Sequence, residues 1–383
     1  MNKDYYNSFL DAAEKSIKEN KGVQLFKTRD DIGSLFVDRD ETTWRFRTML
    51  QHTIENLDEE LNRFEKHFTN KNNAVYWASD YQDVFASLKK IFKAQKVRSV
   101  RLPNINASTI FRELGMKFFL QEEKIALSED GDIQFFVADM MLADLGALLL
   151  LNQSNNSYSR LTNSKTNVFF TTIDRIMSNS DWAEVYHQLA TYRSGGSTQE
   201  AVFFKGSSQC NNYLFIIDNQ RTQLLYNKDL RQSLTCLQCG RCQDVCPVLQ
   251  TIGDEPYNNV FSGPIANVTL PYLESHESYK HVNYACLLCG RCEEVCPISL
   301  PIRDMIIDSR RALLLEGNVD KREQRMLTAE RKQLMSRSKM NASKMMKNIK
   351  LGCFFTSEAK KTRKLPVFKS ETFNKLYLKS KNS

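Results

Sequence analysis

Two runs of cysteine carry the clearest chemistry in this sequence. The first has the pattern C-x2-C-x2-C-x3-C-P from Cys236 to Pro247, and the second repeats it from Cys286 to Pro297, so that together they hold eight of the ten cysteines. The pattern is typical of proteins with two iron–sulfur clusters, in which the fourth cysteine of each run binds the cluster of the other run. Three thiolates at this spacing let a tight loop enclose one cube of iron and sulfur. A fourth thiolate from a distant segment then ties the two halves together.

Crossed ligation predicts two [4Fe–4S] clusters with four cysteine ligands each. We expect the first cluster to be bound by Cys236, Cys239, Cys242 and Cys296. We expect the second cluster to be bound by Cys286, Cys289, Cys292 and Cys246. Structural zinc would require two C-x2-C pairs without a third cysteine in register, and disulfides would require an oxidising compartment, so the doubled run disfavours both.

Glycine and arginine recur at the same place in both runs. Gly240 and Gly290 allow an unhindered turn in which the backbone passes close to a sulfur atom. Arg241 and Arg291 follow these glycines, and two interpretations fit them. Either they raise the reduction potential of the clusters or face an acidic partner, or they are solvated surface residues.

The sequence lacks the other common catalytic motifs. There is no G-x-G-x-x-G, no phosphate-binding P-loop and no H-E-x-x-H, and the five histidines have no ligand spacing. His276 and His281, close to the second run, are interpreted either as residues that tune a cluster or as ordinary turn residues. Cys210 and Cys353 stand alone and are interpreted as small hydrophobes or incidental thiols. No catalytic residue is therefore predicted, and we expect an electron-transfer subunit of an oxidoreductase complex rather than a complete enzyme.

The segments before the cysteines must supply the fold that positions them. Residues 1–39 are predicted to form a helical lead-in with one short helix around Tyr5–Glu19. From Asp40, which has the character of an N-cap, apolar residues recur every three to five positions to about Thr69, and this predicts one long amphipathic helix. The elements predicted next are a strand at 74–78, a helix at 81–95, a strand at 97–102, a helix at 108–114, strands at 117–120, 134–138, 146–151 and 168–173, a helix at 181–190 and a strand at 213–218. Alternating strands and helices indicate parallel pairing, and the continuous apolar runs suit strands buried on both faces, so residues 40–230 are predicted to form one α/β domain.

Three stretches of this domain resemble a known family. They run from Ala138 to Leu151, from Val168 to Ile176 and from Tyr213 to Arg221, and they are similar to the LUD domain of lactate-utilization proteins. A LUD domain followed directly by two four-cysteine runs resembles the LutB-type iron–sulfur subunits of that family. The resemblance implies a parallel-sheet core of the NagB/RpiA/CoA-transferase-like kind, then an α-helical ferredoxin domain at 231–320 with both clusters.

The chain departs from the family pattern at several places, which marks it as a shortened and divergent member. Ala143–Gly146 stands where members tend to have Glu-Thr-Gly, and Ser154–Asn156 stands where they tend to have Glu-Gly-Asn. A LUD domain that keeps a small-molecule site and a purely structural LUD domain are both compatible with these departures.

The resemblance also implies a function and partners. The leading hypothesis is an electron-transfer iron–sulfur subunit of a complex that oxidises L-lactate to pyruvate, with a LutA-like cysteine-rich subunit and a LutC-like LUD subunit as partners. Two clusters suit this reaction because it releases two electrons, whereas a [4Fe–4S] cluster passes one at a time. One alternative is the iron–sulfur subunit of another 2-hydroxy-acid oxidase or of a heterodisulfide-reductase-like complex. Another is a cluster-based sensor or scaffold whose basic tail binds nucleic acid.

Positive charge is concentrated in a basic C-terminal tail. The formal net charge of the 383 residues is +8, yet residues 321–383 alone contain 18 Lys/Arg and 4 Asp/Glu. We expect this tail either to contact an anionic membrane face or an acidic protein, or to be solvated; nucleic acid is disfavoured because no recognition module accompanies the charge. With no apolar signal segment after Met1 and no apolar run of about 20 residues, a soluble cytoplasmic protein is expected.

Overall fold

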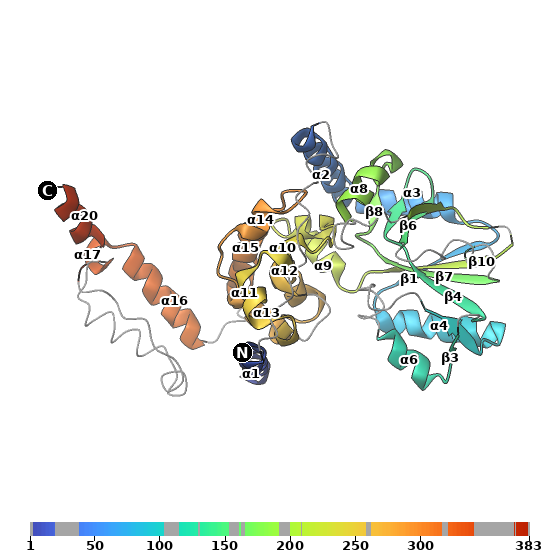
Figure 1. Ribbon diagram of the computed structural model, residues 1–383, viewed down its shortest axis with the longest axis horizontal. Helices are drawn as coiled ribbons and strands as arrows, with labels where there is room; N and C mark the ends of the chain where they lie inside the picture. Colours follow the sequence, from blue (N-terminus) through green and yellow to red (C-terminus); the bar gives the residue numbers. More distant parts are fainter. Residues whose placement is uncertain are drawn as a thin grey trace. The chain divides into compact units, whose positions relative to one another are not determined.

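The computed structural model describes residues 3–19, 38–102, 115–128, 131–152, 161, 165–190, 200–207, 209–257, 262–315, 321–340, 371 and 373–381. The chain forms two compact units, one spanning residues 2–312 and one containing residues 313–383 (Figure 1). Both sheets and both cysteine runs belong to the larger unit.

A six-stranded parallel sheet forms the centre of the larger unit. Its strands are β1 (Asn73–Ala78), β2 (Ser99–Arg101), β3 (Ala126–Leu127), β4 (Ile133–Val137), β7 (Thr166–Thr172) and β10 (Asn211–Ile217). They lie in the order β1-β10-β7-β4-β2-β3, and each pairing is parallel. All seven residues of β7 are buried, as expected for a strand covered on both faces. The α/β fold with a parallel-sheet core is therefore confirmed.

A second sheet of four strands lies in the same unit. Its strands are β5 (Met140–Leu142), β6 (Ala147–Asn152), β8 (Ile176–Met177) and β9 (Glu200–Phe204), in the order β8-β5-β6-β9. The apolar run at 146–151 does form a strand, but β6 pairs antiparallel with β5 and β9 and does not join the parallel sheet. An apolar run indicates burial and carries no information on pairing direction, so the sequence did not reveal this second sheet.

The long helix predicted from Asp40 to Thr69 is wrong in one respect, because it is two helices. α2 (Arg39–Glu55) and α3 (Leu57–Phe68) are separated at Asn56, whose φ of −116° and ψ of 35° are not helical. The Asn56 side-chain amide donates a hydrogen bond to the His52 carbonyl oxygen at 2.8 Å. Asparagine competes in this way for the backbone groups that would otherwise continue a helix.

The strand predicted at 117–120 is also wrong, because this segment is helix α6 (Met116–Glu122). Its buried side chains are Met116, Phe119 and Leu120. They recur at helical spacing, whereas Phe118 between them is 68% exposed. The helix predicted at 108–114 lies outside the described residues.

Two hydrophobic cores flank the parallel sheet. α6 and α4 (Tyr81–Gln95), which begins after the N-cap Asp80, build the smaller core, where the rings of Phe85 and Phe119 stack with their centroids 4.2 Å apart. The larger core contains side chains of α2, α3, the second sheet and α8 (Ala183–Ala190). It continues without a break into Leu237, Ile298 and Leu300 of the cysteine-bearing segment. This shared core fixes the cysteine-bearing segment against the α/β part of the unit.

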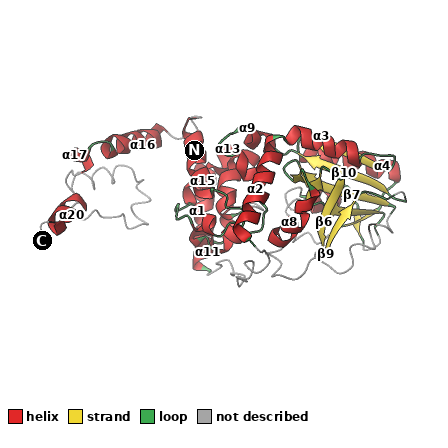
Figure 2. Ribbon diagram, turned by 90° about the horizontal axis from the view of Figure 1, so that it is seen from above, coloured by secondary structure: helices red, strands yellow, loops and turns green. Residues whose placement is uncertain are grey.

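The cysteine-bearing segment is helical (Figure 2). Its elements are α9 (Arg221–Tyr226), η5 (Arg231–Thr235), α10 (Arg241–Asp244), α11 (Pro247–Ile252), η6 (Glu255–Tyr257), α12 (Gly263–Leu273), α13 (His276–Ala285), α14 (Arg291–Glu294) and α15 (Ile302–Leu315). The N-terminal helix α1 (Lys3–Lys18) packs on this segment. Phe9 of α1 lies 5.0 Å from the ring of His281 and 6.0 Å from the ring of Tyr257, centroid to centroid.

The smaller unit contains three helices within its described residues, α16 (Lys321–Leu334), α17 (Arg337–Met340) and α20 (Phe373–Lys381). In α16 and α17, lysine and arginine occupy the last turn, where they complement the negative end of the helix dipole. No described helix in either unit is long and apolar enough to cross a membrane.

Candidate metal centre

The eight paired-run cysteines line two separate pockets. The first cysteine pocket is lined by Cys236, Cys239, Cys242 and Cys296. The second cysteine pocket is lined by Cys246, Cys286, Cys289 and Cys292. The structure therefore brings together the two crossed sets of four that the sequence predicted. Iron binding by these sets stays a prediction.

Each pocket is built by the same local fold, as the repeated sequence requires. Gln238 and Gly240 of the first run have φ values of 54° and 78°, and Leu288 and Gly290 of the second run have φ values of 55° and 81°. These left-handed residues curl the backbone around the sulfur atoms before α10 and α14 begin. The glycine interpretation of both runs is thereby supported, while Gln238 and Leu288 adopt the same conformation without being glycine.

The fourth cysteine of each set arrives because the two runs pack together. The short helices α10 and α14, which contain the third cysteine of their runs, Cys242 and Cys292, contact one another. Cys246 then precedes α11, whose first turn contains Pro247. Cys296 stands at the equivalent place after α14 and also lines the first pocket. Proline starts a helix readily because its fixed φ is helical and its missing N–H is not needed there.

Backbone N–H groups point at three of the sulfur atoms. The N–H of Gln238 donates to Cys236 Sγ at 3.4 Å, that of Leu288 to Cys286 Sγ at 3.2 Å, and that of Leu300 to Cys296 Sγ at 3.3 Å. Hydrogen bonds of this kind stabilise negative charge on a thiolate, and in iron–sulfur proteins they raise the reduction potential.

Burial raises the pKa of the thiols in both pockets. The pKa of Cys236 and of Cys292 rises to about 12, and burial also raises the pKa of Cys242, Cys246 and Cys296. Repulsion between neighbouring thiolates adds to the effect at Cys236 and Cys292. Since the thiolate is the form that binds metal, a bound cation has to displace these protons and compensate the buried negative charge.

The donor chemistry of the two pockets and one buried hydroxyl fit an iron–sulfur cluster. The first pocket encloses about 640 Å³ and the second about 350 Å³, each including the solvent at its mouth. Among the described residues, no three His, Cys, Asp or Glu side chains come close enough to share one metal ion. That spread is compatible with thiolates that each bind a different iron of a cube. Tyr257, 1% exposed, lies within electrostatic range of Cys246 and Cys286; its hydroxyl oxygen faces the backbone N–H of Gly263, and its proton has no acceptor among the described residues. A thiolate or sulfide held in the second pocket offers that hydroxyl an acceptor.

The two pockets differ in exposure and in the charges around them. In the second pocket Cys289 is exposed, and the neighbouring Leu287 is 69% exposed. Arg47 of α2 is within electrostatic range of Cys296 of the first pocket, and it donates to the Ser299 carbonyl oxygen at 2.8 Å and to Gln232 Oε1 at 3.3 Å. The sequence pattern does not identify Arg47 as a residue near the pocket, because its hydrogen-bond partners lie far away along the chain.

The other residues that the sequence singled out, such as His281 and Cys210, are mainly packing residues. His281 is buried against Phe9, and burial lowers its pKa to about 4, so it is a neutral packing residue that lines neither pocket. Cys210 is 2% exposed and its thiol donates to the Leu161 carbonyl oxygen at 3.6 Å, as expected for a small buried side chain. Arg241 lines the first pocket and Arg291 the second. Cys353 and the side chain of His276 lie outside the described residues.

Comparison with known proteins agrees with the chemistry of the two pockets. A family model described as a 4Fe-4S dicluster domain matches residues 232–300, the segment that contains both runs. The chain is similar to lactate utilization protein B of Bacillus thuringiensis (strain Al Hakam), Bacillus cereus (strain AH187) and Bacillus anthracis (strain A0248). Each is 24% identical over 380 aligned positions, which cover 80% of this chain and 78% of the relative. A crystal structure of a DUF162 family protein from Deinococcus radiodurans is similar over 42% of this chain and 98% of its own length, with 14% identity and a TM-score of 0.31.

Proposed function

We propose that this chain, a LutB-like protein with a 4Fe–4S domain, is the electron-transfer subunit of a complex that oxidises L-lactate to pyruvate. The observation that carries the proposal is the grouping of the eight cysteines into two pockets of four, on a chain similar to lactate utilization protein B. Two pockets suit a reaction that releases two electrons, because a bound [4Fe–4S] cluster accepts or passes one electron at a time.

The residues of the chain contribute ligation, enclosure and hydrogen bonding. In this proposal Cys236, Cys239, Cys242 and Cys296 bind one cluster, and Cys286, Cys289, Cys292 and Cys246 bind the other. The N–H groups of Gln238, Leu288 and Leu300 stabilise the ligating thiolates. Apolar side chains such as Ile265 and Ile298 line the first pocket and limit the access of water, which helps to set the reduction potential.

We propose that other subunits remove the proton and the hydride from lactate. We propose a LutA-like cysteine-rich subunit and a LutC-like LUD subunit as partners, in a lactate-utilization system of the kind that the relatives' name denotes. This division of labour follows from the cysteine chemistry of the chain, which moves single electrons and supplies no group that takes a proton from a carbon atom.

Iron content tests the cofactor. After anaerobic reconstitution we expect about eight irons per chain, from two four-iron clusters. Cys210→Ser serves as the matched control, since Cys210 is buried away from both pockets and its loss should leave the iron count unchanged. A content near one or two irons, or stoichiometric zinc, contradicts the cluster assignment.

Crossed ligation is tested separately from cluster content. Cys296→Ser is expected to perturb the electron paramagnetic resonance signal of the cluster that also depends on Cys239. If Cys296→Ser instead alters the signal that depends on Cys289, each run binds its own cluster. The physiological role is tested by deleting the gene and measuring growth on L-lactate as the carbon source, where loss of growth and its rescue by the wild-type chain are expected.

A further inference from the structure

A buried polar network occupies the carboxyl edge of the parallel sheet. Asp139 follows β4, Asp174 and Arg175 follow β7, and Arg221 begins the helix after β10. Asp174, Arg175 and Arg221 are 9%, 6% and 3% exposed. In open parallel sheets this edge is where ligands usually bind. In this chain the edge is filled by the protein's own charged side chains.

Within this network the guanidinium group of Arg175 is only loosely paired with Asp174. Asp174 Oδ1 lies 2.8 Å from Arg221 Nε and accepts a hydrogen bond from the Thr172 hydroxyl at 2.5 Å. Arg175 Nε lies 3.9 Å from Asp174 Oδ2, beyond hydrogen-bond distance. Asp174 is therefore neutralised mainly by Arg221, whereas Arg175 interacts electrostatically with Asp174, with Asp139 and with further neighbours.

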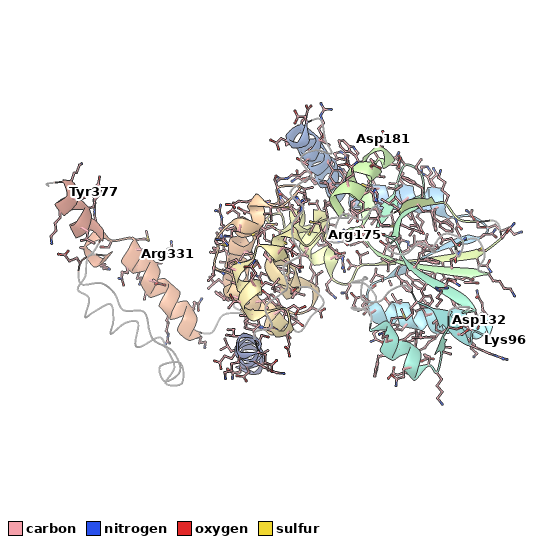
Figure 3. The ribbon with its side chains drawn as sticks, viewed as in Figure 1. Lys96, Asp132, Arg175, Asp181, Arg331 and Tyr377 are labelled. Atoms are coloured by element: carbon pink, nitrogen blue, oxygen red, sulfur yellow. The ribbon has the colours of Figure 1, made fainter. Side chains whose placement is uncertain are left out.

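One of those neighbours is the first cysteine pocket. Arg175 immediately precedes β8, and α2 packs against both β8 and η5, the element that leads into Cys236. Ile176 and Tyr186 lie in the same hydrophobic core as Leu237. Arg175 is within electrostatic range of Cys236, and Figure 3 labels it at the edge of the sheet that faces the cysteine-bearing helices.

The charges around the two pockets are unequal. The first pocket has Arg175 within range of Cys236 and Arg47 of α2 within range of Cys296. At the second pocket the carboxylate of Glu293 is within range of Cys292. Arg303, which lines that pocket, is 45% exposed at its side chain and is shared between Glu293 at 3.9 Å and Asp304 at 3.3 Å.

We propose that Arg175, an α/β-domain residue outside the cysteine motif, sets the reduction potential of the cluster in the first pocket above that of the cluster in the second. The inference rests on the proposed cluster binding. A cluster gains one negative charge when it is reduced, and a buried cation stabilises that extra charge more than an exposed one does. With both clusters bound, an electron at the second pocket would be drawn to the first, and Arg175 of the α/β part would supply positive charge that favours this direction.

The test is a redox titration of the reconstituted protein followed by electron paramagnetic resonance. Cys239→Ser identifies the signal of the first cluster, because Cys239 belongs to the first set under either ligation scheme. In the wild-type protein this signal should have the higher midpoint potential. In Arg175→Met the first cluster should be harder to reduce by about tenfold at a fixed ambient potential, which is the effect that one unit charge would have at about 12 Å and an effective dielectric constant near 20. For a one-electron couple this is about 59 mV.

Matched variants separate electrostatics from structural damage. Arg175→Lys keeps the charge and should keep most of the wild-type potential, and Arg303→Met at the second pocket should leave the first cluster unchanged. A first cluster whose potential is unmoved in Arg175→Met, or two clusters that shift equally, overturns the inference. Should Arg175→Met fail to bind iron, the order of the wild-type potentials still decides, since a second cluster of higher potential also overturns it. A wild-type protein that binds no cluster contradicts the proposed function itself.

Discussion

Replacing Arg221 by methionine gives the sharpest test of how the α/β domain holds its polar edge. Arg221 Nε lies 2.8 Å from Asp174 Oδ1, and the two side chains are only 3% and 8% exposed. Methionine keeps an apolar chain of similar length but leaves the Asp174 carboxylate with the Thr172 hydroxyl and the more distant Arg175. Removing one partner of a buried pair costs about 3–5 kcal/mol, because an uncompensated charge stays buried.

The effect should depend on pH in a defined direction. Burial opposes ionisation of Asp174, but the guanidinium groups of Arg221 and Arg175 outweigh it and hold the pKa of the carboxyl below its usual value. A carboxyl whose pKa is depressed by folding contributes stability above its unfolded pKa and loses that contribution as the pH falls through the folded pKa. The difference between wild type and Arg221→Met should therefore be largest near neutral pH and should shrink in acid.

Thermal unfolding of the reconstituted protein, followed by far-ultraviolet circular dichroism at pH 7, measures the cost. For a unit of this size about 3–5 kcal/mol corresponds to a fall of about 5–8 °C in Tm. Lys89→Met is the matched control, since it removes an exposed ion pair with Glu123 at 2.7 Å and should cost less than about 1 kcal/mol. The double variant Arg221→Met with Asp174→Asn should recover part of the loss. The reasoning is refuted if Arg221→Met costs no more than Lys89→Met, or if adding Asp174→Asn recovers nothing.

Three further outcomes are expected. Gly146 has a φ of 58°, and a Cβ there would lie 2.4 Å from His67 Cβ, whereas Gly115 has a φ of 59° and a Cβ there would meet no atom within 4 Å. Since the left-handed conformation alone costs about 1–2 kcal/mol at either site, Gly146→Ala should lower Tm clearly more than Gly115→Ala. Equal losses of Tm would contradict the packing argument. Burial raises the pKa of Asp139 to about 6. Its contribution to stability is therefore full below the unfolded pKa near 4 and is lost as the pH rises through about 6, so Asp139→Asn should flatten the profile of Tm against pH in that window. An unchanged profile would count against the raised pKa. Tyr257→Phe removes a buried hydroxyl within electrostatic range of Cys246, whose proton has no acceptor among the described residues. It should make the second cluster harder to reduce while leaving the first unchanged, as a redox titration would reveal. A shift in the first cluster alone would show that the hydroxyl serves the other pocket.

The sequence predicted the parts of the fold that depend on local chemistry. The helix at 81–95 has the predicted bounds, since an aspartate N-cap and an apolar face are both local signals. The strands β1, β4, β7 and β10 formed where apolar runs lay between turn residues. The grouping of the eight cysteines in two pockets of four matches the crossed sets predicted from the spacing of the doubled run, and their binding of clusters stays a prediction.

Other features depended on contacts that no local pattern encodes. The run at 146–151 pairs antiparallel with β5 and β9 and does not join the parallel sheet. These partner strands, and not the run itself, decide which sheet it belongs to. The sequence predicts a strand where helix α6 forms, because a short apolar run fits either structure until burial shows which residues share a face. The break at Asn56 likewise required the actual backbone.

The candidate site shows the same division. The sequence by itself predicted two sets of four cysteines, and the same sets line the two pockets, because ligand identity and spacing are properties of short segments. Only the tertiary structure decided that Arg175 and Arg47 are within electrostatic range of Cys236 and Cys296 while Cys289 of the second pocket is exposed. Those arginines are separated from the cysteines by long stretches of chain, and electrostatic interaction depends on distance through space, which only the packed core fixes.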